Sequence, residues 1–228
     1  MEIFFDVFAS CDTIAKTPIE KAGDGMRVIS GSAKGRPLKA VPGTGTRPTT
    51  DKVKEALFSM IGPYFSGGNA LDLFAGTGGL GIEALSRGMD HAVFIDQDRT
   101  SIEVVRHNLE AAKLADKAEI YRNDAFRAIK VLAKRDMRFE LVFLDPPYRL
   151  KQAGELMLQL AESELLESGA TVVVEYESGY RYAEKIGSFY EKRRAVYGET
   201  AVALYRYEPA VSSDDREGGK ESNEEHQV

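Results

Sequence analysis

Residues 71–81 read Leu-Asp-Leu-Phe-Ala-Gly-Thr-Gly-Gly-Leu-Gly, an apolar lead into the spacing Gly76-x-Gly78-x-x-Gly81. A helical apolar pattern follows, so this stretch predicts a strand, a glycine turn and a helix. Such a unit is the corner of a doubly wound α/β sheet at which a nucleotide-containing cofactor binds. Glycines let the backbone approach a ligand closely, and we therefore assign this turn, including the backbone of Ala75, to a cofactor site.

A second motif, Asp145-Pro146-Pro147-Tyr148, follows the apolar run 139–144, which reads as a buried strand of a parallel sheet. Ligands of open α/β sheets bind just beyond the carboxyl ends of the strands. Two prolines stiffen the turn and leave it only backbone acceptors. Asp145 and the Pro146 carbonyl are suited to accept from an exocyclic amino group, and Tyr148 to stack on the base. A proline-stiffened loop without a ligand is the alternative.

The glycine turn alone does not distinguish a nicotinamide dinucleotide from S-adenosylmethionine. Asp72, four residues before Gly76, would disfavour a pyrophosphate and favour the cationic methionine end of S-adenosylmethionine. The amine-binding turn at Asp145 is not needed for hydride transfer. We therefore expect an S-adenosylmethionine-dependent methyltransferase, with an NAD(P)-dependent oxidoreductase as the alternative.

The expected cofactor contacts come from the turn and from two further strand ends. The strand 91–95 ends at Asp96, a position suited to ribose hydroxyls. Each acid could instead cap a helix or a turn. We assign Asp72, Ala75, Gly76 and Gly78 to the methionine part, Asp96 with Gln97 to the ribose, and Asp124 with Ala125 to the adenine.

Several motifs resemble those of class I methyltransferases that act on amino nitrogens: LDLFAGTGGLGIEALSRG, FIDQD, RNDA and DPPY. Residues 27–36 and 46–58 are similar to the front of the RsmD family, which methylates N2 of a guanine in 16S ribosomal RNA. The resemblance runs from about Met26 to Glu208. It implies an α/β, Rossmann-like fold with a mostly parallel seven-stranded sheet, a C-terminal antiparallel hairpin and a short basic N-terminal extension.

The resemblance also implies direct methyl transfer from S-adenosyl-L-methionine to 16S rRNA or to an assembling small ribosomal subunit, by a monomer. The motif DPPY is shared with adenine-N6 methyltransferases of DNA or RNA, so that alternative stays open. A catalytically silent RNA-binding protein is a third possibility, although the intact glycine turn argues against it.

Charge is unevenly distributed along the 228 residues, whose formal net charge is −6. Residues 1–25 and 208–228 contribute −3 and −5, which leaves residues 26–207 at +2. Bases concentrate near the front of this core, a pattern that favours phosphate contact. They are Arg27, Lys34, Arg36, Lys39, Arg47, Lys52 and Lys54. We expect Arg36, Arg47 and Thr49 to bind the RNA substrate.

The domain organisation predicted from these patterns has three parts. Residues 1–25 form a poorly ordered extension before Met26, which is a candidate natural start. Residues 26–208 form the methyltransferase domain, with an RNA-facing segment and first helix at 26–62, and residues 209–228 form a disordered acidic tail.

The single Cys11 and three scattered histidines predict neither disulfides nor a metal site. No apolar stretch is long enough to span a membrane, and we expect a cytoplasmic protein.

Overall fold

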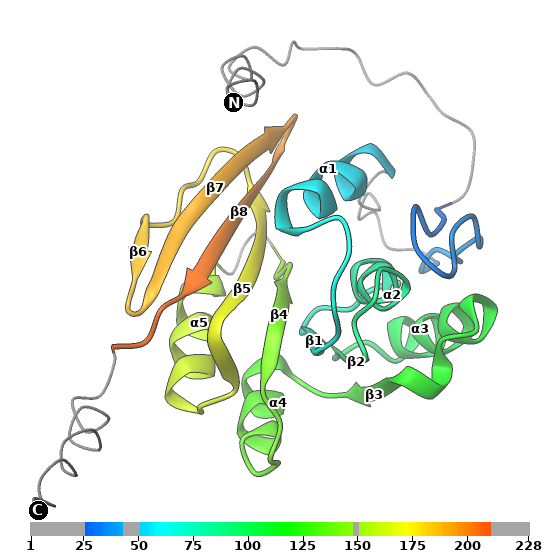
Figure 1. Ribbon diagram of the computed structural model, residues 1–228, viewed down its shortest axis with the longest axis horizontal. Coiled ribbons are helices and arrows are strands. Elements are labelled where there is room, and N and C mark those ends of the chain that lie inside the picture. The colour runs from blue at the N-terminus through cyan, green and yellow to red at the C-terminus, as the bar shows by residue number, and fades with distance from the viewer. Residues whose placement is uncertain (1–25, 43–50, 148–150, 211–228) are drawn as a thin grey trace, which may run out of the picture.

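The computed structural model describes residues 26–42, 51–147 and 151–210, which form an α/β structure around one sheet (Figure 1). The strand order is β3-β2-β1-β4-β5-β8-β7-β6. The first five are mutually parallel, and β8, β7 and β6 are antiparallel to their neighbours. The bounds are β1 Asn69–Asp72, β2 His91–Asp96, β3 Ala118–Arg122, β4 Phe139–Leu144, β5 Leu166–Glu177, β6 Lys185–Ile186, β7 Phe189–Tyr197 and β8 Thr200–Tyr207.

The predicted doubly wound sheet and C-terminal hairpin are confirmed, but the predicted number of seven strands is wrong. The sheet has eight strands because β6 pairs with β7 at the edge beyond the hairpin. A strand of two residues is too short to show the alternation by which strands are recognised in a sequence.

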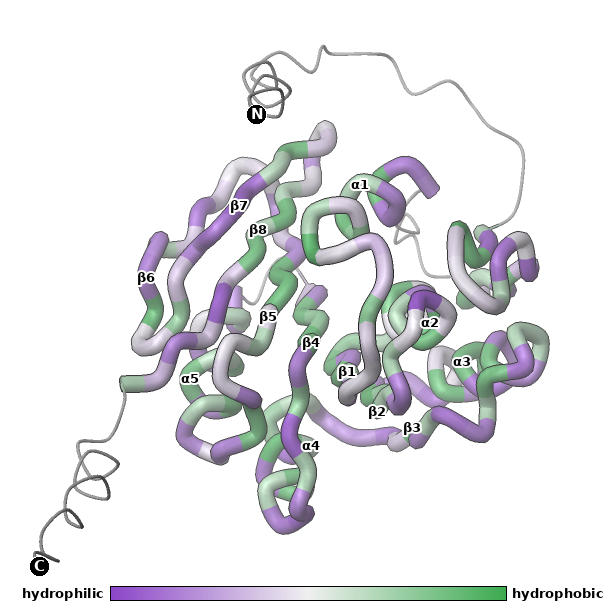
Figure 2. Tube along the Cα trace, viewed as in Figure 1, coloured by the Kyte–Doolittle hydropathy of each residue, from purple (hydrophilic) through white to green (hydrophobic). Residues whose placement is uncertain are grey.

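Helices cover both faces of the sheet and define two apolar clusters. On one face pack α1 (Asp51–Ile61), α2 (Gly79–Ser86) and α3 (Arg99–Ala112). On the other pack α4 (Ala125–Leu132) and α5 (Ala153–Glu162), and a short 3₁₀ turn, η1 (Ala115–Lys117), precedes β3. Figure 2 shows hydrophobic residues along β5 and β8, whereas β7, near the sheet edge, is largely hydrophilic. None of the helices in the described ranges is both long and apolar enough to span a bilayer.

The basic segment that precedes α1 is part of the folded core over residues 26–42. Its apolar side chains Val28, Ala33 and Leu38 are buried in the cluster formed with α1, α2 and α3. The carboxylate of Glu83 on α2 accepts from the backbone N–H groups of Ile29 and Ser30 at 2.8 and 2.9 Å. The segment is therefore held against α2 by buried hydrogen bonds.

Candidate functional site

The glycine turn has the geometry expected of a close backbone approach. Gly76 and Gly78 both have left-handed φ values, 53° and 77°, which side chains with a Cβ rarely adopt. The N–H of Gly78 donates to the Ala75 carbonyl at 2.6 Å, and α2 begins directly afterwards. A Cβ on Gly81 would lie 2.3 Å from the Phe94 ring, so this glycine lets α2 pack against β2. The predicted strand, turn and helix are confirmed.

Asp96 at the end of β2 is tied to that turn. Its carboxylate accepts from the backbone N–H groups of Gly76 and Asp98, each at 2.8 Å. These bonds set the position of the carboxylate between two strand ends. Each carboxylate oxygen has a second lone pair, which is suited to a hydroxyl donor. Gln97 is exposed beside it, and the cap of α3 is Asp98.

Asp124 performs the capping role that the sequence offered as its alternative. Its side chain accepts from the backbone N–H of Arg127 at 3.1 Å and so begins α4. The neighbouring Ala125 is buried against the α4 and α5 cluster. Asp124 therefore lies at a strand end, as expected, with one carboxylate oxygen engaged in a helix cap.

Asp72 is a buried carboxyl group at the end of β1, with 4% of its surface exposed. The Gly81 N–H lies 3.4 Å from its Oδ2, which is a long hydrogen bond. Burial, reinforced by the negative charge of Asp96, raises the pKa of Asp72 to about 7. The carboxyl group is thus placed where a nearby cation would stabilise its charged form.

Asp145 follows β4 at the same edge of the sheet. Leu144 is paired with Val174 of the parallel strand β5, so Asp145 and Glu175 occupy the next register position on adjacent strands. Burial, with repulsion from Glu175 and Asp72, raises the pKa of Asp145 well above its ordinary value. The site therefore gathers three acidic side chains from β1, β4 and β5.

Glu175 lies beside Asp145 but was not predicted as a site residue. The structure buries it, with only 9% of its surface exposed. The available signal is an acidic residue directly after the apolar run Val172–Val174, a pattern typical of the carboxyl end of a buried strand. The sequence does not say which strand lies beside β4, and therefore did not place Glu175 next to Asp145.

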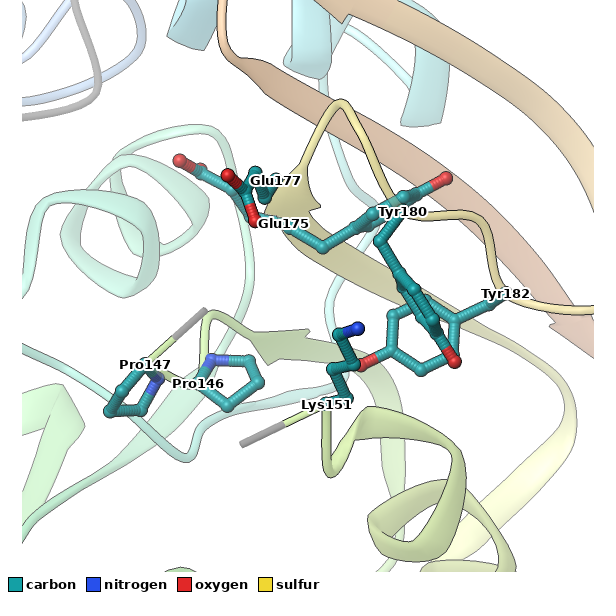
Figure 3. A pocket seen from close by; sticks show the side chains of 8 residues that line it. Pro146, Pro147, Lys151, Glu175, Glu177, Tyr180 and Tyr182 are labelled. Carbon is teal, nitrogen blue, oxygen red and sulfur yellow. The ribbon is translucent and has the colours of Figure 1, made fainter. Parts of the chain in front are cut away.

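A pocket opens beside the proline turn (Figure 3). Prolines 146 and 147 form one side, and Tyr176, Tyr180 and Tyr182 form an aromatic side. The rings of Tyr176 and Tyr182, and those of Tyr180 and Tyr182, pack edge to face with centroids 5.2 and 4.9 Å apart. These tyrosines were also missed by the sequence interpretation. Tyr176 lies in β5 and the other two in the loop after it, and only the folded chain brings them to the proline turn.

Lys151 and the acidic side chain of Glu175 complete the lining of this pocket, together with Glu177. The Lys151 ammonium lies 4.4 Å from the Tyr180 ring centroid, a cation–π distance. The pocket thus combines flat apolar walls with acceptors at the end of β5. Tyr148, which we predicted to stack on the base, lies outside the described residues.

The basic segment divides into surface and core positions. Arg36 is exposed, as are Lys34 and Lys39. Lys54 is 1% exposed: its Nζ donates to the Arg27 carbonyl at 2.5 Å and lies 3.5 Å from Glu83 Oε2. The inclusion of Lys54 among the phosphate-facing bases is therefore wrong. The predicted RNA contacts Arg47 and Thr49 lie outside the described residues.

Within the ranges that the structure describes, no three His, Cys, Asp or Glu side chains are grouped to hold a metal ion.

Known proteins similar to this chain agree with the fold and with the resemblance found in the sequence. A family model described as "Conserved hypothetical protein 95" matches residues 26–206. An Escherichia coli K12 protein named "Ribosomal RNA small subunit methyltransferase D" is 33% identical over 199 residues, 87% of this chain and 98% of that protein. The chain belongs to this family, RsmD.

Two further similar proteins are matched over nearly all of their own length. A Bacillus subtilis protein named "Putative rRNA methyltransferase YlbH" is 52% identical over 181 residues, 79% of this chain and 98% of that protein. The solved structure of "Putative methyltransferase yhhF from Escherichia coli" has a TM-score of 0.68 and 34% identity, and the match covers 81% of this chain and 99% of that one. The predicted methyltransferase class is confirmed.

Proposed function

We propose that this RsmD-family protein transfers a methyl group from S-adenosyl-L-methionine to the exocyclic N2 of a guanine in 16S ribosomal RNA. The observation that carries the proposal is the Asp145-Pro146 turn, which lies beside the acidic residues Asp72 and Glu175 in a methyltransferase fold. RsmD relatives named as ribosomal RNA small subunit methyltransferases support the substrate class.

The acidic surroundings of the corner suit this cofactor. Burial and neighbouring negative charges raise the pKa of both Asp72 and Asp145. A cation placed among them would relieve the repulsion. S-adenosylmethionine supplies an electrophilic methyl group on a positively charged sulfonium. We propose that Asp72 and the backbone from Ala75 to Gly78 hold its methionine part, that Asp96 and Gln97 hold the ribose, and that Asp124 and Ala125 border the adenine.

The proline turn is proposed to orient the guanine amine. Asp145 and the Pro146 carbonyl accept its two hydrogens, so that the nitrogen lone pair faces the methyl group. Such positioning makes the reaction effectively unimolecular. As the N–C bond forms and the S–C bond breaks, the amine nitrogen must release one proton. Asp145, whose pKa is raised, is suited to receive that proton.

The pocket walls are proposed to hold the flat base after it leaves its helix. Tyr148 stacks on the base in this proposal, and Tyr180 with Pro146 borders it from the pocket described above. Stacking on an aromatic side chain contributes roughly 1–3 kcal/mol per base. Extruding a base costs a few kcal/mol. Tyrosine contacts of this strength therefore offset much of the extrusion cost.

The exposed bases near the front of the domain are proposed to contact RNA phosphates. Arg36 is exposed, and we assign Arg47 and Thr49 to the same role. A protein-bound substrate, the assembling small subunit, would supply surface that a domain of this size lacks. We propose that the protein acts as a monomer in the cytoplasm.

Methyl transfer from labelled S-adenosylmethionine to undermodified small ribosomal subunits tests the proposal, with nucleoside analysis of the product. Labelled N2-methylguanosine is expected. If the product is labelled N6-methyladenosine, the protein still transfers a methyl group to an exocyclic amine, but the assignment of guanine as the target base is wrong. If no label is transferred although calorimetry shows that the cofactor binds, the assignment of 16S rRNA as the substrate would be contradicted.

A further inference from the structure

Two carboxylates lie side by side where the amine is proposed to bind. β4 and β5 are parallel and in register up to Leu144 and Val174, so Asp145 and Glu175 come next on strands that lie about 4.8 Å apart. The two groups repel each other, since the charge of Glu175 contributes to the raised pKa of Asp145. Their oxygens form a pair of neighbouring acceptors.

The bases of RNA differ in what lies next to the amino group. In guanine, the N2 amine has the N1–H donor on one side. In adenine, the N6 amine has lone-pair acceptors on both sides, N1 and N7. In cytosine, the N4 amine lies between the N3 acceptor and a carbon. Only guanine therefore presents two adjacent donors, an amine hydrogen and N1–H, to two adjacent carboxylates.

The position of Glu175 in the pocket allows this contact. Glu175 lines the same pocket as Pro146 and Tyr180, on the side reached from the end of β5 (Figure 3). A flat base that stacks on the proline turn would direct its polar edge toward the ends of β4 and β5. A carboxylate has several lone pairs, so an interaction already made by Glu175 leaves acceptor capacity.

We propose that Glu175 determines base specificity, by accepting the N1–H of the guanine whose N2 amine is held by Asp145. This inference rests on the proposed function. With adenine, a lone pair of N1 or N7 would face the Glu175 carboxylate, which disfavours binding. A pocket with Asp145 alone would accept the amine of either purine.

The test uses two substrates and two variants of the full-length protein. After the target guanine has been mapped with the wild type, small subunits are reconstituted with guanine or 2-aminopurine at that position. The base 2-aminopurine keeps the N2 amine but has an acceptor at N1. We expect the wild type to prefer guanine by about 10- to 100-fold in single-turnover rate, the loss that follows when a hydrogen bond to a charged group cannot form.

In Glu175→Gln the side chain keeps its size, and its amide can donate to N1 of 2-aminopurine. The preference for guanine should then fall to within about threefold of unity. Glu167→Gln is the matched control, because it makes the same change at the other end of β5 and should keep the wild-type ratio. Because 2-aminopurine also lacks O6, the decisive quantity is the change in ratio between wild type and Glu175→Gln.

The outcomes separate this inference from the function on which it rests. A wild type that forms N2-methylguanosine but accepts both bases equally would overturn the role of Glu175 without any variant. An unchanged preference in Glu175→Gln, with cofactor affinity retained, would overturn it as well. Failure of the wild type to methylate guanine N2 would instead refute the proposed function, and this inference with it.

Discussion

Two groups of acidic side chains inside this molecule have opposite surroundings. Glu83 on α2 is fully buried and faces donors: the ammonium of Lys54, the guanidinium of Arg87 at 2.8 Å and two backbone N–H groups of the basic segment. Asp72 and Asp145, at the carboxyl ends of β1 and β4, face other acids, and the pKa of each is raised.

The difference separates a structural role from the ligand-binding role that we propose. A buried carboxylate surrounded by donors and cations is satisfied within the protein, and Glu83 accordingly anchors residues 26–42 to α2. A group of buried acids with raised pKa values is stabilised by an added cation or amine donor, and such groups cluster at functional sites. Burial of an acid alone would not have distinguished the two regions.

Removing the paired carboxylate should have the largest effect. In Glu83→Ala, Lys54 and Arg87 would remain buried without their acidic partner, and we expect the free energy of unfolding to fall by about 3–5 kcal/mol. Urea denaturation measures this change. Glu103→Ala is the control, because its ion pair with Arg99 is exposed and should contribute less than about 1 kcal/mol. Equal losses in the two variants would contradict the structural role of Glu83.

Removing the charge from the amine-binding turn should affect catalysis and leave stability intact. We expect Asp145→Asn to lower the single-turnover rate roughly 10²- to 10³-fold, the effect of losing one charged hydrogen-bonding partner of the transition state. The free energy of unfolding should stay equal or rise, because repulsion from Glu175 and Asp72 is relieved. A wild-type rate in this variant would exclude Asp145 from the reaction.

The raised pKa of Asp72 predicts a pH dependence of stability in the cofactor-free protein. The unfolded carboxyl group releases its proton near pH 3.8, whereas the folded one keeps it until about pH 7. Between these values the folded state binds more protons, so stability should fall as pH rises. We expect a decrease on the order of 2–3 kcal/mol, somewhat less than the full shift because buried sites relax.

Asp72→Asn should remove that part of the slope in denaturation measured from pH 4 to pH 7. At neutral pH the same variant should bind S-adenosylmethionine more weakly in calorimetry, since an acid near its cationic end is lost. A slope identical to that of the wild type would show that Asp72 does not titrate in this range.

The smallest effect should come from a surface base of the basic segment, in contrast to the buried Lys54 of α1. We expect Arg36→Ala to raise the KM for small subunits only a few-fold and to lower the salt dependence of binding by about one counterion. Lys185→Ala is the control, because residues 26–42 pack on α2 and α3 near the β3 edge, whereas the exposed Lys185 lies in β6 at the opposite edge of the sheet. Equal effects of the two substitutions would argue against an RNA contact at Arg36.

Much of the site was predictable because it depends on local patterns. The glycine spacing predicted the turn before α2, and Asp96 was expected at the end of β2, where it holds the N–H of Gly76. The proline turn was expected after β4, where the structure places it. Each of these features needs only a strand, the residues that end it and the conformations that glycine and proline allow.

The features that were missed depend on contacts between segments far apart in the chain. Lys54 counted as a surface base in the sequence, but α2 brings Glu83 against it and buries both. The tyrosines of the pocket come from the end of β5 and from the loop after it, and the two-residue β6 exists only through its pairing with β7. No local periodicity reports such partners.

The sequence by itself thus determined the order of strands and helices, the glycine turn and the proline turn, because short-range sterics and apolar periodicity set them. Tertiary structure alone decided which acids are neighbours. Glu175 comes to lie beside Asp145 through the register of two parallel strands, and Glu83 meets Lys54 through the packing of α1 and α2. The chemistry of a carboxylate depends on those neighbours, because a nearby cation stabilises its charge and a nearby acid opposes it.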